Sequence, residues 1–114
     1  MTDKELLELA AKAAGLPHPR WNEAHGYLMI GLGGDTQEWN PLTDDGDALR
    51  LAVKLGFDLR IKTLPHAIYV EVGNGFALSA METLTDVRQK PFDIYAATRR
   101  AIVRAAATIG RNMP

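Results

Sequence analysis

Three aspartates, Asp44, Asp45 and Asp47, lie within four residues of this 114-residue chain and form its densest cluster of potential metal ligands. Such a cluster could bind a divalent ion and support phosphodiester hydrolysis. A calcium loop, however, needs ligands at alternating positions over about a dozen residues and a closing glutamate. The sequence lacks that pattern. The spacing of Asp44 and Asp47 instead suits a capping box at a helix start, so we predict capping and no metal site.

A glycine-rich segment, Gly31, Gly33 and Gly34, follows an apolar run and could cradle a phosphate group. Its spacing is not the dinucleotide-binding fingerprint, and no Gly-Lys-Ser/Thr follows. Asp35 would also repel a phosphate. We therefore predict a tight turn. The alternative is a pocket for a small ligand or nucleotide between these glycines and the helix start at Asp44–Asp47.

Candidate nucleophiles and general bases are few. The three histidines, His18, His25 and His66, are not spaced as metal ligands on a helix, and the chain has no cysteine. Thr36 and Ser79 have no flanking nucleophile motif, so no catalytic triad is indicated. We predict no catalytic residue and no cofactor, and a metal-dependent hydrolase that uses the three aspartates is the least favoured function.

Basic residues gather near the end of the chain. Residues 1–87 carry seven lysines and arginines against thirteen acidic residues, whereas residues 88–114 carry six basic residues against one aspartate. Arg99, Arg100 and Arg104 fall on one predicted helix and could contact an acidic protein or phosphate. The sequence pI near 6.3 argues against a dedicated nucleic-acid binder. The charge pattern favours a solvated helix face or one that pairs with the chain's own acidic residues. The functional hypothesis is a protein-binding surface at these arginines, with Trp21 and Trp39 as aromatic anchors.

Hydrophobic periodicity and breaker residues predict the elements that position these side chains. A first helix covers residues 3–14, an irregular segment with Trp21 follows over 16–26, and a strand covers 27–32. A second helix begins at the Asp44 cap and ends at Gly56, which suits a left-handed cap. Its expected apolar face comprises Leu49, Leu51, Ala52, Val53 and Leu55.

The second half of the chain predicts a small antiparallel sheet and a last helix. Residues 57–62 alternate, with Phe57, Leu59 and Ile61 expected to face inward. A turn at 64–66 leads to a strand over 67–72, and Gly73-Asn74-Gly75 predicts a hairpin to a third strand over 76–80. A polar connection over 81–90 precedes a helix that starts near Pro91 and ends or frays at Gly110.

Composition indicates one ordinary globular domain, residues 1–114. Hydrophobic residues make up 46% and charged residues 24% of the chain. The start lacks a signal-peptide pattern, and no apolar run is long enough to cross a membrane. The expected fold is α+β, an α/β/α layered sandwich in the order α-β-α-β-β-β-α with a largely antiparallel sheet. The expected location is the cytoplasm.

Two segments resemble a known family. Residues 39–56 are similar to the signature of the phage ABA sandwich domain, found in small proteins of tailed phages and prophages. Residues 91–107 are similar to the C-terminal helix of the same family, and residues 5–15 resemble its first helix more loosely. The resemblance implies an α/β/α layered fold and a phage or prophage origin. It implies no activity, so no catalytic or binding residue is carried over from it.

The sequence thus favours a phage- or prophage-encoded accessory protein that binds a host or phage protein in the host cytoplasm and is not an enzyme. A sponge-like protein that binds a small ligand or nucleotide is the alternative. Nucleic acid and membrane are not expected partners. A homodimer is compatible with the chain because a small sheet leaves edges that can pair.

Overall fold

The computed structural model describes residues 1–63, 68–74, 77–84 and 94–114; for Thr63, Ile68, Asn74 and 77–84 it describes only the backbone. Helices are α1 (Asp3–Ala14), α2 (Asp45–Lys54) and α3 (Ile94–Arg111), with a short 3-10 turn η1 (Gly33–Asp35). Strands are β1 (Arg20–Asn22), β2 (Tyr27–Ile30), β3 (Gln37–Trp39), β4 (Phe57–Thr63), β5 (Ile68–Asn74) and β6 (Ala77–Leu84). The expected turn at 64–66, His66 with it, and the helix start at Pro91 lie outside the described residues.

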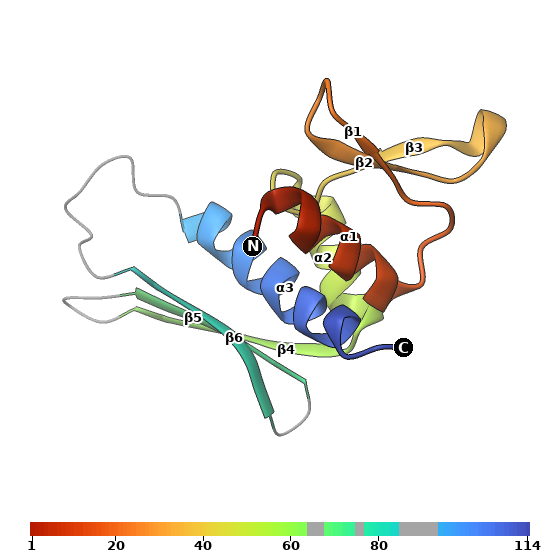
Figure 1. Ribbon diagram of the computed structural model, residues 1–114. Coiled ribbons are helices and arrows are strands. Elements are labelled where there is room, and N and C mark those ends of the chain that lie inside the picture. Colours follow the sequence, from red (N-terminus) through yellow and green to blue (C-terminus); the bar gives the residue numbers. More distant parts are fainter. Residues whose placement is uncertain (64–67, 75–76, 85–93) are drawn as a thin grey trace.

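The described strands form two antiparallel sheets, in the orders β1-β2-β3 and β4-β5-β6. Figure 1 shows the helices between the two sheets, with α3 over the sheet of β4, β5 and β6 and the small sheet beyond α1. The α+β class and the antiparallel pairing are confirmed. Two short strands were not predicted, β1 and β3, and β6 extends to Leu84, where a polar connection was expected.

The most extensive helix packing among the described residues is that of α1 against α3. Alanines dominate the buried positions of both helices: Ala10, Ala11, Ala14, Ala97, Ala101, Ala105, Ala106 and Ala107. Gly110 is buried in the last turn of α3, where an added Cβ would lie 2.0 Å from the carbonyl oxygen of Leu9. The helix ends at Arg111, one residue after the predicted end at Gly110, but Gly110 is itself a helical, buried residue. Its missing side chain allows the two backbones to approach.

The larger sheet packs against α3 through its apolar face. Leu59 and Ile61 of β4 lie opposite Val72 and Val70 of β5, so all four share one face. The two valines are fully buried in the central strand, whereas Leu59 and Ile61 are 44% and 51% exposed. The predicted alternation is confirmed, but of the three expected inward residues only Phe57 packs against the core.

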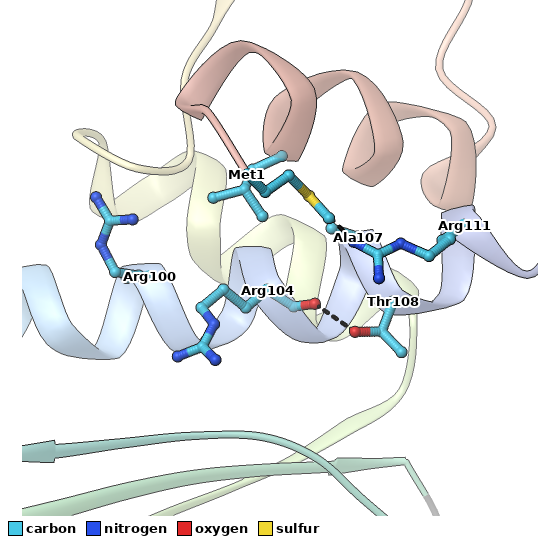
Figure 2. Close-up of a pocket in the computed structure, with 7 residues that line it drawn as sticks. Met1, Arg100, Arg104, Ala107, Thr108 and Arg111 are labelled. Carbon is cyan, nitrogen blue, oxygen red and sulfur yellow. Dashed lines mark hydrogen bonds between the residues drawn. The ribbon is translucent and has the colours of Figure 1, made fainter.

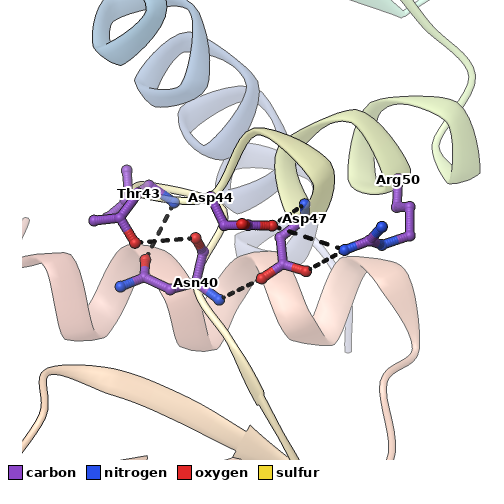
Figure 3. A network of polar contacts seen from close by, with 6 residues as sticks. Asn40, Thr43, Asp44, Asp47 and Arg50 are labelled. Atoms are coloured by element: carbon purple, nitrogen blue, oxygen red, sulfur yellow. Dashed lines mark hydrogen bonds and ion pairs between the residues drawn. The ribbon is translucent and has the colours of Figure 1, made fainter.

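The start of α2 is held by a polar network (Figure 3). The Asp44 carboxylate accepts a hydrogen bond of 2.8 Å from the backbone N–H of Asp47, which confirms the cap. The Asp47 carboxylate does not return this contact to Asp44. It accepts from the backbone N–H of Asn40 at 2.9 Å and from Arg50 at 2.7 Å. The Asp47 side chain thereby connects the turn at Asn40 to the first turns of α2.

The apolar face of α2 is narrower than expected. Ala48, Leu51 and Ala52 are buried, whereas Leu49 is 62% and Val53 is 71% exposed. Leu49 and Val53 are four residues apart, which places them on one side of the helix. Gly56 ends the segment with φ +66°, as predicted for a left-handed cap. No helix in the described part of the chain is long and apolar enough to span a membrane.

Candidate partner-binding surface

Three arginines of α3 line one groove on the surface of the helix pair. Arg100, Arg104 and Arg111 border a cavity of about 440 Å³ together with Met1, Leu6, Ala107 and Thr108 (Figure 2). Leu6 comes from α1, and Ala107 is buried at the base of the groove. The groove therefore combines a cationic rim with a partly apolar floor.

The contacts that the described residues make with Arg100 and Arg111 are exposed. Arg100 lies 3.6 Å from the carboxylate of Asp3, and both side chains are about half exposed, at 46% and 61%. Arg111 donates to the sulfur of Met1 at 3.5 Å. Ion pairs of this exposed kind contribute little to stability. The guanidinium groups of Arg100 and Arg111 can therefore exchange these contacts for those of a partner at small cost.

Arg99 does not belong to this surface, although the sequence grouped it with Arg100. Its Nε donates to the carbonyl oxygen of Leu42 at 2.8 Å, and its Nη1 donates to Asp45 Oδ1 at 2.6 Å. The side chain is only 16% exposed. Arg99 thus ties α3 to the residues before α2 and to the first turn of α2, and its predicted role in partner binding is corrected to a structural one.

The two tryptophans differ in their exposure to solvent. Trp39 is 7% exposed and belongs to the hydrophobic core, so it is not available as an anchor. Trp21 is half-buried against the core, and its indole N–H donates to the carboxylate of Glu23. It lines a shallow cavity of the small sheet with Arg20 and Thr36. Trp21 therefore keeps an accessible edge, on an element other than α3.

The alternative ligand pocket was expected between the glycine segment and the aspartates. In the structure, Gly33 and Asp47 line two different cavities. Gly33 and Trp21 line the same cavity, and none of the three aspartates lines it. Asp47 lines a different cavity, with Trp39 and Arg50, which contains none of the glycines. Gly31 has φ +95°, and an added Cβ there would lie 2.6 Å from the carbonyl oxygen of Asp35. The glycine segment is thus a tight turn, as predicted, and Gly34 is an exposed residue of η1.

No group of three or more acidic, histidine or cysteine side chains that could hold a metal ion occurs among the described residues. Asp44, Asp45 and Asp47 are engaged with Arg50, Arg99 and backbone N–H groups instead. His25 contacts the side-chain oxygen of Asn22 and stacks on Tyr27, with ring centroids 5.4 Å apart. His18 is exposed with φ +48°.

Sequence reasoning missed one apolar cavity. It has a volume of about 460 Å³ and lies between α2, α3 and β4, where Leu49, Leu59, Ile61, Tyr95 and Ile102 line it. Three of these residues were expected in the core, and their apolar character was clear. What the sequence does not show is that β4 is the terminal strand of its sheet among the described strands, which leaves these three side chains partly exposed.

Comparison with protein-family models, with curated proteins and with solved structures finds no match for this chain.

Proposed function

We propose that the chain is a protein-binding module without catalytic activity, and that the arginine groove of Arg100, Arg104 and Arg111 receives an acidic segment of its partner. The observation that supports this proposal most directly is that three arginines line one groove together with the buried apolar residues Leu6 and Ala107. Arginine is the residue best suited to bind carboxylates, because its planar fork can form two parallel hydrogen bonds.

The length of the arginine groove suggests the kind of segment that fits. Arg100 and Arg111 are eleven residues apart on α3, which corresponds to about 16 Å along a helix. An extended peptide rises about 3.3 Å per residue, so about five residues would span the groove. A segment with acidic side chains at alternate positions could face all three arginines, while small apolar side chains contact Leu6 and Ala107.

A phage or prophage origin and action in the host cytoplasm are part of the same proposal. They rest on the resemblance of residues 39–56 and 91–107 to the phage ABA sandwich domain. The partner is then a host or phage protein. The size of the domain and the lack, among the described residues, of a side-chain group that could hold a metal ion favour binding over metal-dependent chemistry.

The test compares two double variants that change the net charge equally. Arg100→Glu with Arg104→Glu reverses two cations of the groove. Lys4→Glu with Lys54→Glu reverses two exposed lysines that do not line it. Each variant, with the wild type, is immobilised and exposed to lysate of phage-infected cells, and bound proteins are identified by mass spectrometry.

We expect one acidic protein to be retained by the wild type and by the lysine variant and to be lost from the arginine variant. Thermal unfolding of all three proteins controls for folding. Equal retention by the arginine variant would reject the groove as the binding surface. Retention that disappears after nuclease treatment would show that nucleic acid is the ligand and would overturn the protein-binding proposal.

A further inference from the structure

The outer edge of β4 is unpaired in the part of the chain that the structure describes. β4 is the terminal strand in the order β4-β5-β6, and it pairs with β5 over all seven of its residues, Phe57–Thr63. It contains no proline and no bulge. An edge strand of this length presents a row of backbone donors and acceptors that can pair with another strand.

Exposed apolar side chains lie beside this edge. Leu59 and Ile61 on β4 are about half exposed, and Leu49 of α2 lines the same cavity at 62% exposure. Val53 follows Leu49 by one turn and is 71% exposed. Apolar residues that gather at an unpaired strand edge mark an interaction surface more specifically than scattered ones do. Together they form the β4 edge surface, made of Leu49, Val53, Leu59 and Ile61.

The sequence of β4 is complementary to itself when read in the opposite direction. In an antiparallel pair of two β4 strands centred on Leu59, Phe57 lies opposite Ile61 and Leu59 lies opposite Leu59 of the other copy. On the other face, Asp58 lies opposite Arg60, twice by symmetry. Opposite charges directly across an antiparallel pair are stabilising, and so are facing apolar side chains. In this one register, apolar side chains therefore face each other on one side of the sheet, and opposite charges face each other on the other side.

The neighbouring registers lack this match. A pair centred on Arg60 places Asp58 opposite Lys62, but it also places Arg60 against Arg60. A pair centred on Ile61 places Arg60 opposite Lys62, twice. Like charges directly opposite one another are destabilising. The charge pattern of Asp58, Arg60 and Lys62 thus selects the register centred on Leu59.

We propose that the chain forms a symmetric dimer in which β4 pairs with β4 of a second copy in the register centred on Leu59. The two sheets then join into one of six strands, and the interface is isologous. Since α2 lies on the same side of the sheet as Leu59 and Ile61, the two-fold axis brings α2 toward α2 of the second copy. Leu49 and Val53 then meet their equivalents. The arginine groove lies on α1 and α3, so this interface does not depend on the proposed function.

Charge exchange within β4 tests the register. Asp58→Arg places an arginine of each copy opposite Arg60 of the other, and Arg60→Asp places an aspartate of each copy opposite Asp58 of the other. Each single variant should raise the dimer dissociation constant about tenfold or more, the size expected when two cross-strand pairs become repulsive. The two variants mixed in equal amounts should form a heterodimer, because each arginine then faces an aspartate.

Lys62→Asp is the matched control. Both Arg60 and Lys62 lie near Glu71 of the same chain, at 3.9 and 3.5 Å, so each variant loses a comparable intrachain pair. In the proposed register, position 62 lies opposite Gly56 and not opposite a charge. Lys62→Asp should therefore leave dimerisation nearly unchanged, whereas Arg60→Asp should weaken it.

The measurement is sedimentation velocity from micromolar to submillimolar protein, with thermal unfolding of each variant as the folding control. A wild-type dimer, weakened singles and a heterodimer from the mixture support the proposal. A wild type that stays monomeric throughout overturns it. So does a dimer that is indifferent to Asp58→Arg and Arg60→Asp, or one that Lys62→Asp weakens as much as Arg60→Asp does.

Discussion

Replacing Arg99 by methionine should destabilise the protein far more than the same change at the adjacent Arg100. Arg99 donates to the carbonyl oxygen of Leu42 at 2.8 Å and to Asp45 at 2.6 Å, with a side chain only 16% exposed. Arg100 forms one ion pair of 3.6 Å between two half-exposed side chains. Methionine keeps much of the length of the arginine stem and removes the charge and its donors in both cases.

The magnitudes follow from exposure. A hydrogen bond from a charged donor contributes about 1.5–3 kcal/mol when it is partly buried. The partner Asp45 is 72% exposed, so its pair with Arg99 is screened and adds at most about 1 kcal/mol. We therefore expect Arg99→Met to lower the free energy of unfolding by about 2–3 kcal/mol and Arg100→Met by less than about 0.5 kcal/mol.

Thermal unfolding followed by circular dichroism separates these values. At about 2.1 cal/mol/K per residue, a chain of 114 residues loses about 4 °C of Tm for each kcal/mol. Arg99→Met should then melt about 8–12 °C below the wild type, and Arg100→Met within about 2 °C of it. Asp45→Asn should reproduce only the smaller part of the Arg99 effect. Equal melting temperatures for the two methionine variants would refute the distinction between a structural and a surface arginine.

Three further changes test the packing of Gly110 and the cap of α2. Gly110→Ala should lower the free energy of unfolding by about 3 kcal/mol in chemical denaturation, because its Cβ would collide with the Leu9 carbonyl. Gly46→Ala is the control: the atoms nearest to a Cβ there are side-chain atoms of Arg50 and Asp44, so stability should be unchanged or slightly higher, and an equal loss would contradict the steric argument. Asp44→Ala should cost about 1 kcal/mol in the same assay, since the Asp47 N–H loses its acceptor; no loss would reject the cap.

Features set by neighbouring residues were predicted well. The limits of α1 and α2 follow from caps that lie next to them in sequence, such as Asp44 at the start of α2 and Gly56 after its end. The alternation of β4 is likewise local. Such signals need only a few residues to act, because a cap satisfies backbone groups within one turn.

Features set by distant residues were not predictable in this way. Leu59 and Ile61 have the pattern of buried residues, and only the order of strands leaves them at an edge. A glycine at position 110 is typical of a helix end, and only the close approach of α1 explains why a glycine is buried there. The hydrogen bonds of Arg99 join it to residues more than fifty positions away. In each case the decisive contact comes from another part of the chain.

Helix geometry alone could nevertheless have placed Arg99 on a different face of α3 from Arg100, Arg104 and Arg111. At about 100° per residue, Arg104 lies about 40° and Arg111 about 20° from Arg100 around the helix axis, so the three form one stripe. Arg99 lies about 100° away from Arg100 in the opposite sense, toward the side that meets α2. Arg99 and Arg100 are therefore on different faces of α3 although they are neighbours in sequence. Arg100 and Arg111 are on the same face although eleven residues separate them. A variant that probes partner binding should therefore change the stripe and keep Arg99, because loss of Arg99 would weaken the attachment of α2 and imitate a loss of binding.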